Sequence, residues 1–117
     1  MRKLALGVVG LLALAVVSFA TQKAKTFSGQ IMDSQCAKMG SHEMGYKMTN
    51  TSTPRDCTLA CVRAGGHFVL YDAAHNVTYQ LDDQKKPEAF AGENVKVVGT
   101  YDSTTKTIHV EKIEAAR

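Results

Sequence analysis

The chain has 117 residues, with 14 Lys and Arg against 11 Asp and Glu. Arg2 and Lys3 lie in a segment without acidic residues, and without these two side chains the count is 12 basic against 11 acidic. So small an excess argues against nucleic acid as a partner. A chain of this length has room for one modest hydrophobic core, which a disulfide or a metal ion would help to stabilise.

The first 20 residues are typical of a secretory signal peptide. A basic start is followed by an apolar run over residues 4–17, and Ser18-Phe19-Ala20 places small residues before a cleavage point. The apolar run is short for a membrane span. We therefore expect a signal peptide over residues 1–20 and a single domain over residues 21–117, which is periplasmic or secreted and not held in a membrane after cleavage.

The first predicted strand covers Thr26 to Asp33, where apolar and polar residues alternate. Its central Gly29 suggests a bulge or a sharp bend. The following segment, Ala37 to Thr53, is polar and rich in Gly, Ser, Thr and Met, so we expect it to be irregular.

A helix is predicted directly after this segment. Thr53 is a capping residue, Pro54 suits the first helical position, and Gly65-Gly66 ends the helix. Cys57 and Cys61 are four residues apart, which places both sulfur atoms on one helical face. Leu59 and Val62 then lie on the other face.

Four further strands complete the pattern. Residues 68–71 and 77–81 form a predicted hairpin, residues 87–91 fit a short helix that ends at Gly92, and residues 95–98 and 108–113 form a second pair of strands. Ile113 breaks the alternation of the last strand. The fold is thus expected to be mainly β: a five-stranded OB-like barrel with a helical, cysteine-containing insertion between strands 1 and 2 and a short helix before strand 4.

Three short runs carry a resemblance to known proteins: residues 26–34, 56–62 and 91–99. They resemble small exported bacterial domains of OB-like shape whose function is not established. In that group a cysteine after the first strand, a histidine in the next loop and a Cys-x-x-x-Cys helix recur, and Cys36, His42, Cys57 and Cys61 occupy those places. The resemblance implies a fold and a compartment but no activity.

The chemically reactive side chains gather between Met32 and Cys61, which include all three cysteines and four of the five methionines. Thiolates, imidazole and thioethers are ligands of soft and borderline metals, so we expect a site for Cu(I) or Zn. The predicted metal ligands are Cys36, His42, Cys57 and Cys61, with Met39 and Met44 as additional candidates.

Two alternatives compete with the metal site. A disulfide of Cys36 with Cys57 or Cys61 would staple an OB-like interaction module that binds an unknown ligand or protein, and would leave one free cysteine. A thiol redox protein is the third reading, because Cys57 lies in a first helical turn that favours a thiolate. No phosphate-binding loop, nucleophile elbow or pair of catalytic carboxylates is evident, so we do not expect an enzyme.

Overall fold

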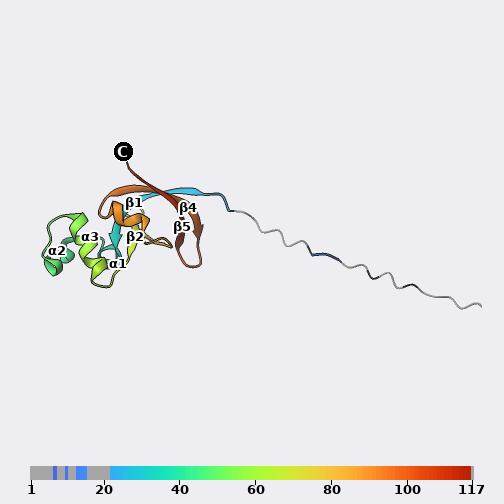
Figure 1. Ribbon diagram of the computed structural model, residues 1–117, viewed down its shortest axis with the longest axis horizontal. Helices are drawn as coiled ribbons and strands as arrows, with labels where there is room; N and C mark the ends of the chain where they lie inside the picture. The colour runs from blue at the N-terminus through green and yellow to red at the C-terminus, as the bar shows by residue number, and fades with distance from the viewer. Residues whose placement is uncertain (1–6, 8–9, 11–12, 16–21, 117) are drawn as a thin grey trace, which may run out of the picture.

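The computed structural model describes residues 7, 10, 13–15 and 22–116 (Figure 1). The predicted signal segment, residues 1–20, lies almost entirely outside these residues, and its cleavage stays a prediction. Among the described helices, none has the length and apolar character needed to cross a membrane.

The described fold consists of five strands and a group of short helices. The strands are β1 (Lys25–Asp33), β2 (Phe68–Asp72), β3 (Val77–Leu81), β4 (Asn94–Asp102) and β5 (Thr107–Ala115). The helices α1 (Ser34–Met39), α2 (Glu43–Thr49) and α3 (Pro54–Arg63) lie between β1 and β2, and the 3-10 helix η1 (Lys86–Phe90) precedes β4. The expected mainly β class and the expected insertion point of the helices are therefore confirmed.

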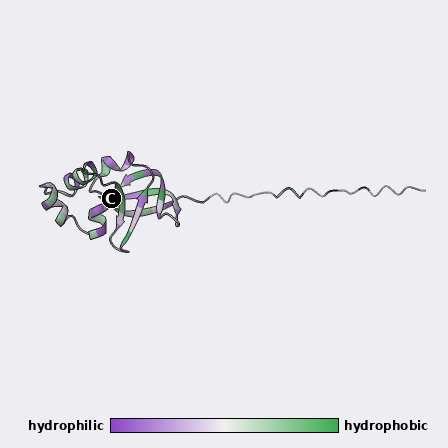
Figure 2. Cartoon of the chain, turned by 90° about the horizontal axis from the view of Figure 1, so that it is seen from below, coloured by the Kyte–Doolittle hydropathy of each residue, from purple (hydrophilic) through white to green (hydrophobic). Residues whose placement is uncertain are grey.

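The five strands form one sheet that closes on itself in the order β1-β2-β3-β5-β4. Closure is possible because β1 pairs with β4 through its first six residues and with β2 through its last four, with Gln30 in both pairings. All neighbours are antiparallel except β3 and β5, which run parallel. Figure 2 shows the strands wrapped around each other, with the three helices grouped at one end.

The main core fills the interior of this sheet, because every second residue of a strand points inward. Its buried members are Ile31, Phe68, Leu70, Leu81, Ala91, Val95, Val97 and Ile108. The pattern is clear in β4, where Val95 and Val97 are fully buried and Lys96 between them is exposed. Strand β4 thus has the faces that its alternation predicts.

A register shift in the β4–β5 pair explains why Ile113 breaks the alternation. Val97 pairs with Ile113 and Val98 with Lys112, but Gly99 pairs with Val110, so Glu111 is an extra residue. One extra residue restores Val110 and Ile113 to the same face.

Of the bulge or sharp bend expected at Gly29, the bulge is absent, because the β1–β4 register runs through this residue without a shift. A glycine is needed at this position because the backbones of β1 and β2 come close together there. A Cβ on residue 29 would lie 2.5 Å from the carbonyl oxygen of Tyr71 on β2.

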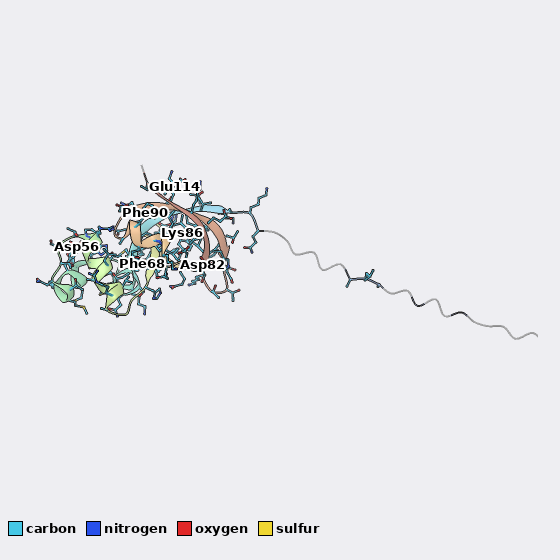
Figure 3. The ribbon with its side chains drawn as sticks, in the orientation of Figure 1. Asp56, Phe68, Asp82, Lys86, Phe90 and Glu114 are labelled. Carbon is cyan, nitrogen blue, oxygen red and sulfur yellow. The ribbon has the colours of Figure 1, made fainter. Side chains whose placement is uncertain are left out.

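The end of β1 and the start of β2 are buried on both faces, because the helices cover the outside of the sheet there. Ile31 and Leu70 belong to the main core, whereas their neighbours Met32 and Val69 pack in a second cluster beneath the helices. Figure 3 shows how far this helical end, marked by Asp56, lies from the C-terminal end of β5, marked by Glu114. We call the second cluster, together with the adjoining Asp33, His42, Gly45 and Cys61, the helical pocket.

The segment from Ala37 to Thr53 is mostly helical, so the irregular loop predicted there was wrong. The stop signals are local: Gly40 and Asn50 adopt left-handed conformations that end α1 and α2. The start signal of α1 is Asp33, whose side chain accepts hydrogen bonds from the backbone N–H groups of Gln35 and Cys36. The α3 prediction is confirmed, with Thr53 as its cap.

Candidate metal centre

Helix α3 carries two of the three cysteines and has two different faces, as its sequence predicts. Leu59 and Val62 pack against the main core. Cys57 is fully buried in the helical pocket, and the less buried Cys61 packs against it. Because the apolar face is anchored on the sheet, both sulfur atoms are held toward α1 and α2.

Cys36, His42 and Cys57 come together in the helical pocket. One side-chain ligand atom from each lies within 4.8 Å of the others. A tetrahedral zinc site with Zn–S bonds of about 2.3 Å places its ligand atoms roughly 3.5–3.8 Å apart. A contraction of about 1 Å or less would therefore bring the three donors to coordinating distance.

His42 is the most informative member of this group. Both of its ring nitrogens are buried, and neither has a hydrogen-bond partner among the described residues. The other histidines differ, since His67, His75 and His109 each pair a ring nitrogen with a side-chain oxygen. An unpaired buried nitrogen is costly, and a bound metal ion is one way to satisfy it.

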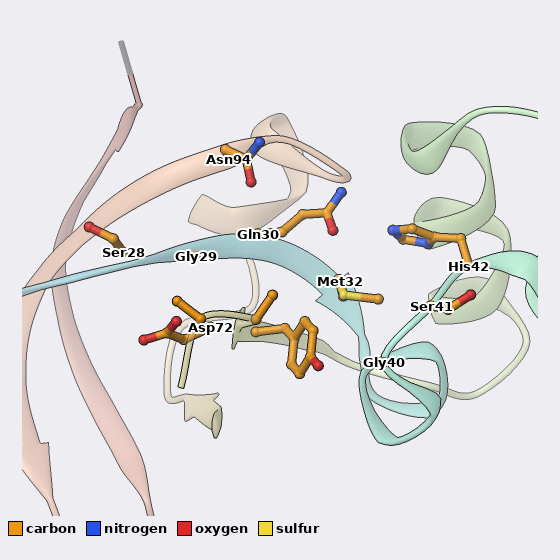
Figure 4. Close-up of a pocket in the computed structure, with 12 residues that line it drawn as sticks. Ser28, Gly29, Gln30, Met32, Gly40, Ser41, His42, Asp72 and Asn94 are labelled. Atoms are coloured by element: carbon orange, nitrogen blue, oxygen red, sulfur yellow. The ribbon is translucent and has the colours of Figure 1, made fainter. Parts of the chain in front are cut away.

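The surroundings of His42 suit a neutral metal ligand. Burial lowers its pKa, although the Asp33 carboxylate opposes that shift, so the ring is uncharged at neutral pH. The ring stacks on Tyr46, with 5.7 Å between the ring centroids. Figure 4 shows the imidazole pointing from the start of α2 toward β1, where His42 borders a hollow of about 350 Å³. None of the three cysteines lines this hollow, so it meets the site only at His42.

A second group of potential ligands shares Cys36 with the first. Ligand atoms of Asp33, Cys36 and Cys61 also lie within 4.8 Å of one another. The pKa of Cys61 is raised to about 11, first by burial and then by the neighbouring Asp33 and Cys57. Burial likewise raises the pKa of Cys36, with Asp33 as the next cause. Without a metal, Cys36 and Cys61 are therefore thiols at neutral pH.

Gly45, in the interior of α2, faces the sulfur atoms directly. A Cβ at this position would lie 2.6 Å from the Cys57 sulfur, 2.7 Å from the Cys36 sulfur and 3.8 Å from the Cys61 sulfur. The backbone there is an ordinary helix, because Gly45 is not among the glycines with positive φ. The glycine is needed for space and not for conformation, and the space it leaves is lined by all three thiols.

All three cysteines are free, and no pair among them lies at bonding distance. The structure therefore does not support the disulfide staple expected as the main alternative. Cys36 and Cys57 are held close together without a covalent link, which is the arrangement that a shared metal ion requires.

Met39 and Met44 lie at the surface, with 49% and 52% of their area exposed. They border a shallow hollow together with Ser41, Glu43 and Lys47. The structure therefore brings four of the predicted site residues into one pocket and leaves these two methionines outside it.

Asp33 and Gly45 are not predicted as residues of the site from the sequence. Asp33 was read only as the end of a strand, although an acidic residue directly before a helix is a capping signal. Gly45 lay in a segment read as a loop, where glycine is unremarkable. Within a helix glycine costs about 1 kcal/mol relative to alanine, so recognising α2 would have marked it as a position of close approach.

Comparison with known proteins covers the sheet but not the pocket. A family described as a protein of unknown function (DUF5818) matches residues 62–116, from the end of α3 through β5. This part of the chain is thus similar to an uncharacterised small domain family. The match includes none of Cys36, His42, Cys57 and Cys61. No curated protein and no solved structure matches the chain.

Proposed function

We propose that this protein binds a soft or borderline metal ion in the helical pocket, with Cys36, His42 and Cys57 as its core ligands and Cys61 beside them. One observation carries the proposal: two buried thiols and a histidine with two unpartnered buried nitrogens lie within 4.8 Å of one another. Three protein ligands leave a coordination position for Cys61 or for a further ligand.

Zinc, or another borderline divalent ion, fits the donors better than copper. Thioether ligands would favour Cu(I), but Met39 and Met44 are half exposed and lie outside the pocket. The pocket adds an imidazole and a carboxylate to its thiols, and zinc accepts all three donor types. Cu(I) bound by the three cysteines is the alternative metal.

The domain that holds the site is, we propose, an OB-like barrel of bacterial origin. Two features support this fold: the strand order β1-β2-β3-β5-β4 and the short helix between β3 and β4. The features that support export are those of residues 1–20. Sequencing of the exported protein should then begin at Thr21, and a membrane-held product that begins at Met1 would contradict it.

Within this proposal the protein is a binding domain and not an enzyme, its ligand is a metal ion, and its partners include neither nucleic acid nor a membrane. The near balance of charge after residue 20 supports the exclusion of nucleic acid. A thiol redox protein fits less well, because the pKa values of Cys36 and Cys61 are raised and reactive cysteines have lowered values.

The substitution His42→Ala tests the proposal. It removes one ligand and also removes two unpartnered buried nitrogens, so the metal-free protein should be at least as stable as the wild type. Zinc affinity, measured by competition with a chromophoric chelator, should fall by one to two orders of magnitude or more. His109→Ala is the matched control, because His109 is exposed and pairs with Asp82.

Mass spectrometry of the native protein completes the test. Before metal is added, the wild type should have the mass of a chain with three thiols. A mass that then increases by that of a bound metal ion supports the site. A metal-free protein two hydrogens lighter than its thiol form, and indifferent to His42→Ala, would replace the metal site by a disulfide-stapled module.

A further inference from the structure

The second ligand group of the helical pocket contains a buried carboxylate that helix capping uses only in part. Asp33 is fully buried, and its Oδ2 accepts hydrogen bonds from the backbone N–H groups of Gln35 and Cys36 at 3.1 Å each. Its Oδ1 is also buried and has no hydrogen-bond partner among the described residues. Capping therefore satisfies Oδ2 of Asp33, and this carboxylate also interacts with the Cys36 thiol, whose pKa is raised first by burial and then by Asp33.

Asp83, which precedes the cap residue of η1 and is partly exposed, makes backbone hydrogen bonds like those of Asp33. Its Oδ1 accepts from the backbone N–H groups of Lys85 and Lys86, with the same sequence spacing as at Asp33. Its Oδ2, however, pairs with the ammonium group of Lys86 at 2.7 Å. One carboxylate oxygen of Asp33 lies within 4.8 Å of the thiols of Cys36 and Cys61, and Asp33 forms no salt bridge among the described residues. A positive charge is the partner that its Oδ1 lacks.

The two ligand groups of the pocket have only Cys36 in common. His42 belongs only to the group with Cys36 and Cys57, whereas Asp33 and Cys61 form the other group with Cys36. No set of four or five of these residues meets the same distance limit. The two groups therefore describe two neighbouring positions that share one sulfur.

We infer, on the basis of the proposed function, that the helical pocket holds two borderline divalent cations bridged by the Cys36 thiolate. The first is bound by Cys36, His42 and Cys57, and the second by Asp33, Cys36 and Cys61. Each thiol releases its proton to water as the metal–sulfur bond forms. Three thiolates and one carboxylate then carry four negative charges, which two divalent ions balance in a site where net charge is costly.

Zinc titration of the reduced protein, followed by native mass spectrometry, tests the number of ions. The wild type should bind two Zn²⁺ per chain, and His42→Ala, Asp33→Asn and Cys61→Ser should each bind one. Asp33→Asn is the sharpest variant, because asparagine caps a helix as well as aspartate does but is a poorer metal ligand. Asp83→Asn is its matched control and should still bind two ions.

A spectroscopic readout separates a changed fold from a lost site. Co²⁺ bound to thiolates gives intense charge-transfer absorption, and this should reach its maximum at two equivalents in the wild type and at one in Asp33→Asn. Circular dichroism should show the same helix content for both proteins. One Zn²⁺ in the wild type, unchanged by Asp33→Asn, would overturn the second position and leave the first intact. Two ions in Asp33→Asn would also overturn the assignment, whereas no metal at all in the wild type would overturn the proposed function itself.

Discussion

The main core and the helical pocket lie on opposite faces of the same two strands but differ in how well their polar groups are satisfied. Ile31 faces the main core and Met32 the pocket, as do Leu70 and Val69 on β2. The buried polar or charged residues among those described are Asp33 and Thr58, and neither lies on the strands that supply the main core from β2 to β5. All four unpartnered buried side-chain atoms among the described residues belong to Asp33, His42 and Thr58, which lie in or next to the helical insertion.

This difference indicates a division of roles. A core that is apolar throughout stabilises the fold by burial alone, at about 25 cal/mol for each Å² of apolar surface. Unpartnered buried polar atoms reduce stability, and native proteins contain few of them. Three of the four atoms belong to Asp33 and His42, which group with the cysteine thiols, and the proposed metal site would supply partners for them. The predictions below test this division, beginning with the largest expected effect.

Substitution of Val97 by Asp should unfold the domain. Val97 is fully buried in the main core, and an unpaired carboxylate there costs several kcal/mol, a large part of the 5–15 kcal/mol that stabilises a typical domain. Lys96→Asp is the control on the exposed face and should change stability by about 0.5 kcal/mol or less. Urea denaturation measures both. Equal losses would show that β4 does not have the faces described.

In the helical pocket, Gly45→Ala should reverse the usual effect of this substitution. In an ordinary helix interior alanine stabilises by about 1 kcal/mol over glycine, but here its Cβ would press on the sulfur atoms of Cys36 and Cys57. Overpacking typically costs about 1–3 kcal/mol, so we expect a net loss of up to about 2 kcal/mol together with weaker zinc binding.

Lys47→Ala, at an exposed position of the same helix, is the control for Gly45→Ala and should leave both quantities nearly unchanged. Thermal denaturation with and without Zn²⁺ measures them. An alanine at position 45 that stabilises the protein and binds zinc normally would mean that the sulfur atoms are not packed against α2.

The cap of α3 should matter less, because it lies outside both clusters. Thr53 accepts a hydrogen bond from the backbone N–H of Asp56 at 3.2 Å, and Thr53→Ala should cost about 1 kcal/mol. Zinc affinity should change little, since Leu59 and Val62 still anchor the helix on the sheet. The exposed Ser52 provides the comparison through Ser52→Ala, which should be silent in the same denaturation experiment.

The last two predictions concern pH. The first, for the metal-free protein, involves no change in stability at neutral pH. The pKa of Cys61 is raised from 9.0 to about 11, mainly by burial, so the folded metal-free protein holds this proton more tightly than the unfolded chain does. That contribution is complete below pH 9 and is lost as the pH rises toward 11. Cys61→Ser should therefore flatten the fall in melting temperature over this range, measured with reductant and chelator present.

With zinc bound, the pH dependence near neutrality should have the opposite sign. Metal binding requires thiolates, so zinc affinity should increase as the pH rises from 6 toward 8. The stabilisation by a fixed zinc concentration should increase with it. Stabilisation by zinc that is independent of pH would contradict thiolate ligands. The helical pocket would then not differ from the main core in metal binding.

The sequence by itself determined the elements with strong local signals. Alternation marked the five strands, and Thr53, Pro54 and the paired glycines marked α3, because period and capping depend on neighbouring residues alone. It also singled out Cys36, His42, Cys57 and Cys61 by their chemistry. The helices α1 and α2 were missed, because six and seven residues are too few for a clear period.

Only the tertiary structure decided how these residues meet. It left the thiols unpaired, placed Met39 and Met44 at the surface, and brought Asp33 and Gly45 to the sulfur atoms. None of this follows from spacing, because the distances depend on three short helices packing on the outer face of β1 and β2. That packing is set by Leu59 and Val62 on the sheet and by contacts between residues far apart in the chain, which no local pattern records.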